Sequence, residues 1–173
     1  MANTTFSGPV RSENGFIDIT KNTSTGAITT NFTLGSSGLL ATPVAVPDAN
    51  TTLTATTYAG RTLVLPNLTT ATAFTLPTPS AGLHYKFVYG GAAQDNQNAI
   101  ITTGSDTNFF IGGVIHLNTG GNAAAVFANG SSNSKLTLVD QGLMEINILA
   151  KDSVNWYVWG HIASASAPTF ADQ

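Results

Sequence analysis

Histidine is the side chain best suited to proton transfer and metal binding near neutral pH, and the chain has three: His84, His116 and His161. His84 alternates with aromatic residues in LHYKFVY (83–89), His116 follows two β-branched residues, and His161 ends a tryptophan-rich segment. None of them has the HxH, HExxH or HxxE spacing of common metal sites. We therefore expect ordinary strand histidines, and a metal site only where the fold assembles one from distant positions.

The carboxylates are dispersed along the chain. Asp95-Asn96-Gln97-Asn98 offers oxygen ligands like those of a calcium loop, but it lacks a downstream glutamate at EF-hand spacing, so an Asx-turn is the simpler expectation. Asp106, Asp140 and Asp152 fall in expected turns. No GxSxG, Walker or GxGxxG motif is present, and no carboxylate pair indicates glycoside hydrolysis. We predict no enzymatic activity and no cofactor.

Aromatic residues are concentrated in VNWYVWGH (154–161), where Val154, Trp156 and Val158 alternate with Asn155, Tyr157 and Trp159. One of these two faces belongs to a core. The other is open to three interpretations: a subunit interface, a platform on which a sugar stacks, or a second buried face.

The amino-acid composition argues against two classes of binding partner, nucleic acids and membranes. Of the 173 residues, 9% are charged, against about 25% in an average soluble domain, and the formal net charge is −3. The six Lys and Arg form no cluster, so we expect no nucleic-acid partner. No apolar run reaches the ~20 residues that span a bilayer, so we expect no membrane partner. Cysteine is absent, and residues 1–16 lack the apolar region of a signal peptide, so we expect synthesis and folding in a cytoplasm.

Short runs of alternating hydrophobicity, separated by Gly, Asn, Pro or Ser, predict an all-β fold. Gly112-Gly113 interrupts one run and indicates a bulge or the close approach of another backbone. LVLP (63–66) and FTLP (74–77) are similar strand ends, which we interpret as belonging to neighbouring strands. The pattern is typical of an antiparallel, jelly-roll-like β-sandwich, with strands expected at 62–65, 71–76, 83–89, 98–103, 109–117, 123–128, 135–139, 143–149 and 154–161.

Residues 1–57 have a different character, with three short β-like pieces (15–20, 26–34 and 51–57) and two prolines in LLATPVAVPD (39–48). Ordering a residue's backbone costs about 1–2 kcal/mol, whereas an isolated buried Phe returns only about 1.5–3 kcal/mol. We therefore predict that 1–57 is an extended arm ordered by another subunit or protein. The sandwich is then 58–163, and 164–173 is a tail with one anchor, Phe170.

An all-β domain with an extended arm and few charged residues suits a protein that functions by binding other proteins through its surface. Thr, Asn and Ser can be buried against a partner without desolvating charge. Extended arms bind by adding strands to a neighbour's sheet edge, and several joined arms bind with avidity.

A resemblance supports this interpretation. The opening MANTTFSGPVRSENGF (1–16) resembles the start of small virion structural proteins of tailed phages, marine ones especially. Ala59-Gly60-Arg61-Thr62, Thr75-Leu76-Pro77 and the closing Trp156-Tyr157-Val158 resemble a β-sandwich module of phage capsid decoration (cement) proteins and head fibres. The resemblance implies a homotrimer on the outer surface of the virion, bound to the major capsid protein and bridging neighbouring capsomers, without catalysis.

Two alternatives remain. One is a head- or tail-fibre protein with a receptor- or glycan-binding β-domain, using Trp159 or the loops 90–98 and 118–122. The other is a lectin or glycan-active enzyme unrelated to virions. For a decoration protein, we expect these apolar residues to face the partner: Phe6, Val10, Phe16, Ile17, Leu39, Leu40, Val44 and Val46.

Overall fold

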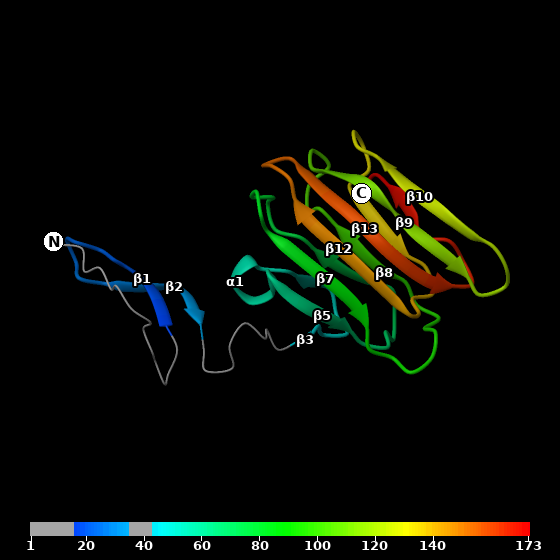
Figure 1. Ribbon diagram of the computed structural model, residues 1–173, viewed down its shortest axis with the longest axis horizontal. Helices are drawn as coiled ribbons and strands as arrows, with labels where there is room; N and C mark the ends of the chain where they lie inside the picture. The colour runs from blue at the N-terminus through cyan, green and yellow to red at the C-terminus, as the bar shows by residue number, and fades with distance from the viewer. Residues whose placement is uncertain (1–15, 35–42) are drawn as a thin grey trace, which may run out of the picture. The chain divides into compact units, whose positions relative to one another are not determined.

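The computed structural model describes residues 16–34 and 43–173, and the chain divides into two compact units, Met1–Ala41 and Thr42–Gln173 (Figure 1). The described residues are almost entirely strands and connecting turns, with one short helix. The predicted all-β class is therefore confirmed. The two units are described separately below.

The first unit contains an antiparallel hairpin of β1 (Phe16–Lys21) and β2 (Ile28–Leu34), close to two of the predicted β-like pieces. The turn between them forms because the Asn22 side-chain oxygen accepts the N–H groups of Ser24 (2.9 Å) and Thr25 (3.0 Å). Gly26 supplies the positive φ, 73°, that closes the turn. This sheet has two strands only, so it offers little area for burying its own apolar residues.

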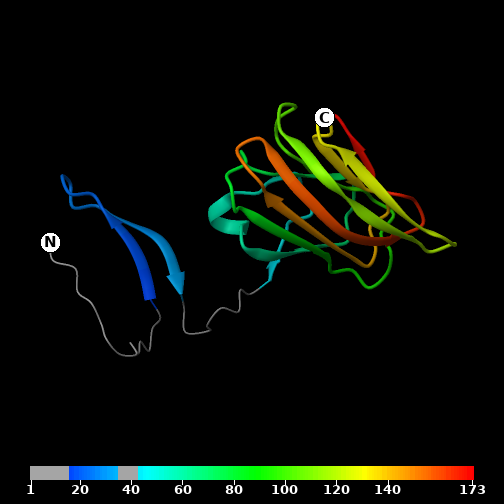
Figure 2. The same cartoon turned by 45° about the horizontal axis from the view of Figure 1, so that its top comes forward.

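The second unit contains two sheets and one short helix, α1 (Ala55–Tyr58). Figure 1 shows the larger sheet as a row of long strands, and Figure 2 shows the same unit turned. In order across the sheet, the seven-stranded sheet consists of β10 (Ala123–Asn129), β9 (Phe109–Asn118), β13 (Asn155–Ser164), β12 (Met144–Ala150), β7 (His84–Tyr89), β5 (Arg61–Leu65) and β3 (Val44–Ala45). The five-stranded sheet consists of β14 (Thr169–Ala171), β11 (Lys135–Leu138), β8 (Ala99–Thr102), β6 (Thr72–Thr75) and β4 (Thr51–Thr52).

The prediction of an antiparallel, jelly-roll-like sandwich is wrong in its topology, because both sheets are mixed. From β3 to β8 the chain alternates between the sheets, so that β3, β5 and β7 are parallel neighbours in one and β4, β6 and β8 in the other. Each of these strands is followed in the chain by a strand of the opposite sheet. The strand after that returns to the first sheet, where it lies next to the earlier strand and parallel to it. LVLP and FTLP therefore end strands of different sheets, β5 and β6, and are not neighbours.

Both sheets bury their alternating apolar residues in one hydrophobic core, which gives the unit its sandwich-like character. In the seven-stranded sheet, the Tyr85 and Trp156 rings meet edge to face with centroids 5.9 Å apart. Burial raises the pKa of Tyr85 to about 12, so its hydroxyl stays protonated. In the five-stranded sheet, Phe74 and Ile101 are fully buried.

The second unit includes more of the sequence at both ends than predicted. The unit begins at Thr42 instead of residue 58, because β3 and β4 pair with β5 and β6. The tail 164–173 also contributes a strand, since β14 pairs with β11. The Phe170 ring packs edge to face on Phe110, with centroids 6.1 Å apart, so the predicted anchor is confirmed.

Candidate functional site

The surface of the seven-stranded sheet that faces away from the core carries a group of exposed apolar side chains. On β13, Trp156 and Val158 are buried, while Tyr157 and Trp159 point outward, Trp159 with 45% of its surface exposed. Within the second unit, β13 is therefore not buried on both faces. Neighbouring strands β9 and β10 add to the group, which we call the outer apolar face and which consists of Ile115, Leu117, Phe127, Tyr157 and Trp159.

Two adjacent glycines of β9 explain how the strands beneath this face fit together. Gly112 has φ 111°, and a Cβ atom there would lie 2.3 Å from the backbone oxygen of Val158 on β13. The Phe127 ring lies against Gly113, where a Cβ atom would come within 2.7 Å of its Cδ1. The registers of β9 with both neighbours are unbroken, so the close backbone approach predicted at Gly112-Gly113 is confirmed, and no bulge is present.

Beside the outer apolar face, the same surface becomes polar over β12 and β7. Lys86 Nζ lies 2.8 Å from Glu145 Oε2, and the Asn147 side-chain amide donates to Glu145 Oε1 at 3.1 Å. These hydrogen bonds hold the pKa of Glu145 below its usual value, with a smaller contribution from the charge of His161. The ion pair is partly exposed and leaves this strip without net charge.

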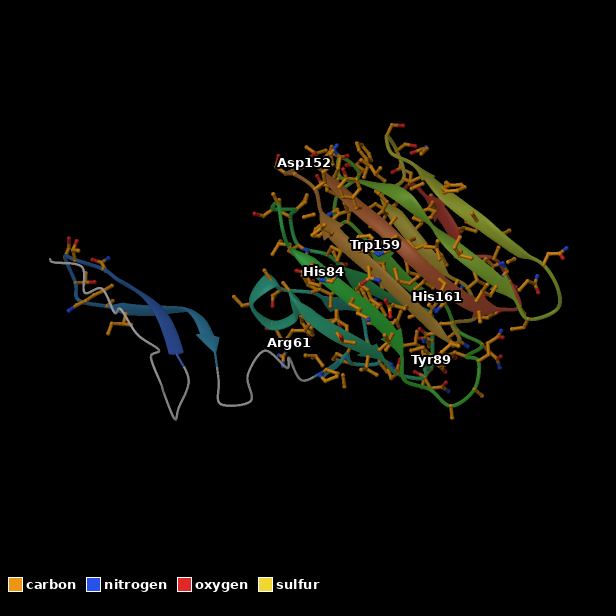
Figure 3. All side chains as sticks on the ribbon, in the orientation of Figure 1. Arg61, His84, Tyr89, Asp152, Trp159 and His161 are labelled. Atoms are coloured by element: carbon orange, nitrogen blue, oxygen red, sulfur yellow. The ribbon has the colours of Figure 1, made fainter. Side chains whose placement is uncertain are left out.

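An aromatic pair joins the two parts of the surface. The rings of His84 (β7) and Trp159 (β13) are nearly parallel, at 13°, with centroids 6.2 Å apart (Figure 3). Because β12 lies between β7 and β13, the two rings meet across β12. The surface therefore offers an aromatic ring beside amide, carboxylate and ammonium groups. Apart from the Lys86–Glu145 pair, the five strands from β10 to β7 contain no Asp, Glu, Lys or Arg.

A hollow of about 350 Å³ lies near the end of this sheet. It brings together parts of the two loops predicted from the sequence, Gly91 to Gln94 of loop 90–98 and Thr119 of loop 118–122. The other lining residues are Tyr89, Gly142, Leu143 and Ala163. Of these, Leu143 is 75% exposed. None of the lining side chains is charged, so the hollow suits a small uncharged or apolar group.

Loop 90–98 is held in place by a buried carboxylate. Asp95 is 4% exposed, and its Oδ2 accepts the backbone N–H of Leu68 (2.7 Å) and the side-chain amide of Gln141 (3.0 Å). Its Oδ1 accepts the N–H of Gln97 at 3.1 Å, which is the Asx-turn that the sequence predicts. The carboxylate oxygens are thus occupied by N–H donors and tie three segments together.

The other histidines and carboxylates considered in the sequence analysis lie apart from one another. His116 is buried beneath β9, with Nε2 3.0 Å from the Ser164 carbonyl oxygen, whereas His84 and His161 lie on the outer surface. Asp152 accepts the N–H groups of Val154 and Asn155, which lower its pKa. Among residues 16–34 and 43–173, no three His, Asp or Glu side chains gather as a metal site would require.

The residues predicted to face a partner are distributed over both units. Phe6, Val10, Leu39 and Leu40 lie outside the described residues, and Phe16 and Ile17 lie in β1. Val44 is partly buried against the core, and Val46 is 3% exposed within it. The prediction that Val46 faces a partner is therefore wrong, because the chain's own core covers this side chain.

Sequence reasoning missed Ile115, Leu117 and Phe127 as surface residues. The available signal was that 109–117 carries large apolar residues at both odd and even positions, which an ordinary half-buried strand does not need.

No protein-family model matches the chain, and no curated protein sequence does either. In the part of the chain that the structure describes, no helix is both long and apolar enough to cross a membrane.

Proposed function

We propose that the protein is a structural component of a tailed-phage virion: a capsid decoration (cement) protein that binds the outer face of the major capsid lattice and bridges neighbouring capsomers. In this proposal, residues 1–41 act as an arm that is stabilised on a partner surface. The second unit covers the lattice, and assembly of several copies presents several arms at once, which raises avidity.

The observation that carries this proposal is the two-stranded hairpin of the first unit. A lone two-stranded hairpin is at best marginally stable in water. β1 and β2 nevertheless contain six large apolar residues, and Ile28 is 62% exposed. Binding to the surface of another protein buries such residues and adds the contacts that the hairpin lacks. The opening segment that resembles phage virion proteins (1–16) ends at Phe16, the first residue of β1.

The outer apolar face supports the same proposal independently. Contiguous exposed apolar groups of this kind commonly mark protein interfaces. The strands that carry the face, β9, β10 and β13, contain no Asp, Glu, Lys or Arg, so covering the face requires little desolvation of charged groups.

Capsids that lack the protein provide the test. Purified chain is added back, and its copies per particle are counted by quantitative mass spectrometry. A decoration protein is recovered in fixed proportion to the major capsid protein. Ile28→Lys should bind about tenfold or more weakly, because it places a charge at the interface. Ser24→Lys, an exposed change in the hairpin turn, is the matched control and should bind normally. Recovery of only a few copies, or no recovery, contradicts the proposal.

A second candidate, a head- or tail-fibre protein with a glycan-binding β-domain, is favoured by the aromatic pair. Trp159 is exposed and lies near Asn147, Glu145 and Lys86, a combination of ring and hydrogen-bonding groups that suits a pyranose. A glycan-array signal that Trp159→Ala abolishes and Phe127→Ala preserves would support it. An array without signal leaves the decoration protein as the better assignment.

A further inference from the structure

The second unit has four sheet edges, and three of them are short. The edge strands β3 and β4 have two residues each, and β14 has three. The fourth edge is β10, with seven residues. Short edge strands are one way in which proteins prevent their sheets from pairing with other chains, because they present few free backbone groups. By this criterion β10 is the one unprotected edge within the described part of the unit.

β10 also lacks the other protective features. Its sequence, AAAVFAN, contains no charged residue and no proline, and five of its seven residues are exposed. Its antiparallel pairing with β9 runs without a register shift from Ala123–Leu117 to Asn129–Ile111. β14 of the other sheet lies close to β10 but is hydrogen-bonded to β11, so no described strand is paired with the free backbone edge of β10. A long, regular and uncharged edge is a template for another strand.

We propose that β10 pairs antiparallel with β10 of a second copy of this chain, joining two seven-stranded sheets about a two-fold axis. An interface of this kind is self-complementary, since the same strand serves both sides. Each copy carries a net charge of −3, but β9 and β10 contain no Asp, Glu, Lys or Arg. The strands therefore meet without the like-charge repulsion that opposes dimer formation elsewhere on the surface.

The side chains of the outer surface fit this pairing. Facing residues in a sheet share one side, so Phe127 of one copy lies opposite an odd-numbered residue of the other, such as Ala123 or Ala125. These alanines are small and leave Leu117 and Ile115, their partners on β9, exposed. Phe127, itself 72% exposed, can lean over the alanine of the second copy toward these two residues. The pairing thus covers three exposed apolar side chains on each copy.

Sedimentation velocity of the purified full-length chain over a range of concentrations tests this proposal without capsids, so its outcome is independent of the proposed virion function. Ala125→Lys places like charges close to the two-fold axis, and Phe127→Ala removes the large side chain. Ala81→Lys makes the same exposed Ala-to-Lys change in the turn between β6 and β7 and is the control. Circular dichroism and melting temperature establish that each variant folds.

Wild type and Ala81→Lys should reach twice the mass of Ala125→Lys, with association about tenfold or more weaker in Phe127→Ala. Equal masses of wild type and Ala125→Lys at every concentration would overturn the proposal. A separate capsid-binding assay identifies the alternative occupant. If the mass of the free chain never doubles and Ala125→Lys loses capsid binding, the capsid protein occupies the edge, and the proposal is overturned. Dissociation of the Ala81→Lys control to the same extent would show a general charge effect and would equally contradict the pairing of β10.

Discussion

Replacing Gly112 by alanine tests the parallel pairing of β9 and β13 that underlies the outer apolar face. The added Cβ atom would lie 2.3 Å from the Val158 backbone oxygen, about 1 Å closer than an ordinary contact of 3.4 Å. The obstacle is backbone and not a flexible side chain, so the strands themselves must separate. The substitution also places a residue with a side chain at φ 111°.

The size of the effect follows from these two terms. An unfavourable positive φ costs about 1–2 kcal/mol in a residue with a side chain, and forcing packed groups apart costs about 1–3 kcal/mol. We therefore expect Gly112→Ala to lower the free energy of unfolding by about 3 kcal/mol. In a domain of this size each kcal/mol shifts the melting temperature by about 3–4 °C, so the melting temperature should fall by roughly 10 °C.

Differential scanning calorimetry of wild type and two variants measures this. Gly121→Ala is the matched control, because a Cβ atom there has open space around it and the residue needs no positive φ. It should change stability by less than about 0.5 kcal/mol. If Gly112→Ala melts within about 2 °C of the wild type, β9 does not approach β13 as closely as described, and the parallel pairing is refuted.

Three further predictions concern the sites around this sheet. Asp95→Ala should lower the free energy of unfolding by about 3 kcal/mol in urea titrations, because it leaves buried N–H groups without an acceptor, whereas Asp106→Ala, in an exposed turn, should have little effect. Glu145 has a lowered pKa in the folded protein, so its ion pair with Lys86 stabilises above the ordinary glutamate pKa, and this stabilisation is lost as the pH falls through the folded pKa. Glu145→Gln should therefore melt slightly below the wild type at neutral pH and together with it in acid; a difference that persists in acid contradicts this assignment. In the Trp156→Phe variant, iodide should quench the remaining Trp159 fluorescence in the free chain, and capsid binding should reduce the quenching; unchanged quenching would show that the outer apolar face is not covered.

The strands were largely predictable, and their order was not. The nine segments expected between 62 and 161 all form strands, because alternating apolar residues and turn-forming residues fix local structure strongly. The same alternation does not specify which strand lies beside which. LVLP and FTLP have the same local pattern, yet β5 and β6 enter opposite sheets, because pairing is decided by tertiary packing that involves residues far apart in the chain.

The candidate site was predictable in part for a related reason. Alternation placed Trp156 and Trp159 on opposite faces of one strand, which the structure confirms, but it did not say which face is the core. Both faces carry aromatic residues, and only the position of the five-stranded sheet decides between them. Val46 shows the converse error: the sparse apolar residues of 1–57 and the two prolines of 39–48 indicated an arm. A two-residue strand and a few contacts are nevertheless enough to attach Val44 and Val46 to the core.

Hydrogen exchange of the backbone amides, measured on the free chain at low concentration and again on capsids, tests most directly whether the first unit depends on a partner. The account predicts that amides of β1 and β2 exchange at nearly the unstructured rate in the free chain, while those of β7, β12 and β13 remain protected. On capsids, the amides of 16–34 should become protected as well. Equal protection of 16–34 and the core strands in a free monomer would show that the hairpin is stable unaided, and would contradict the account.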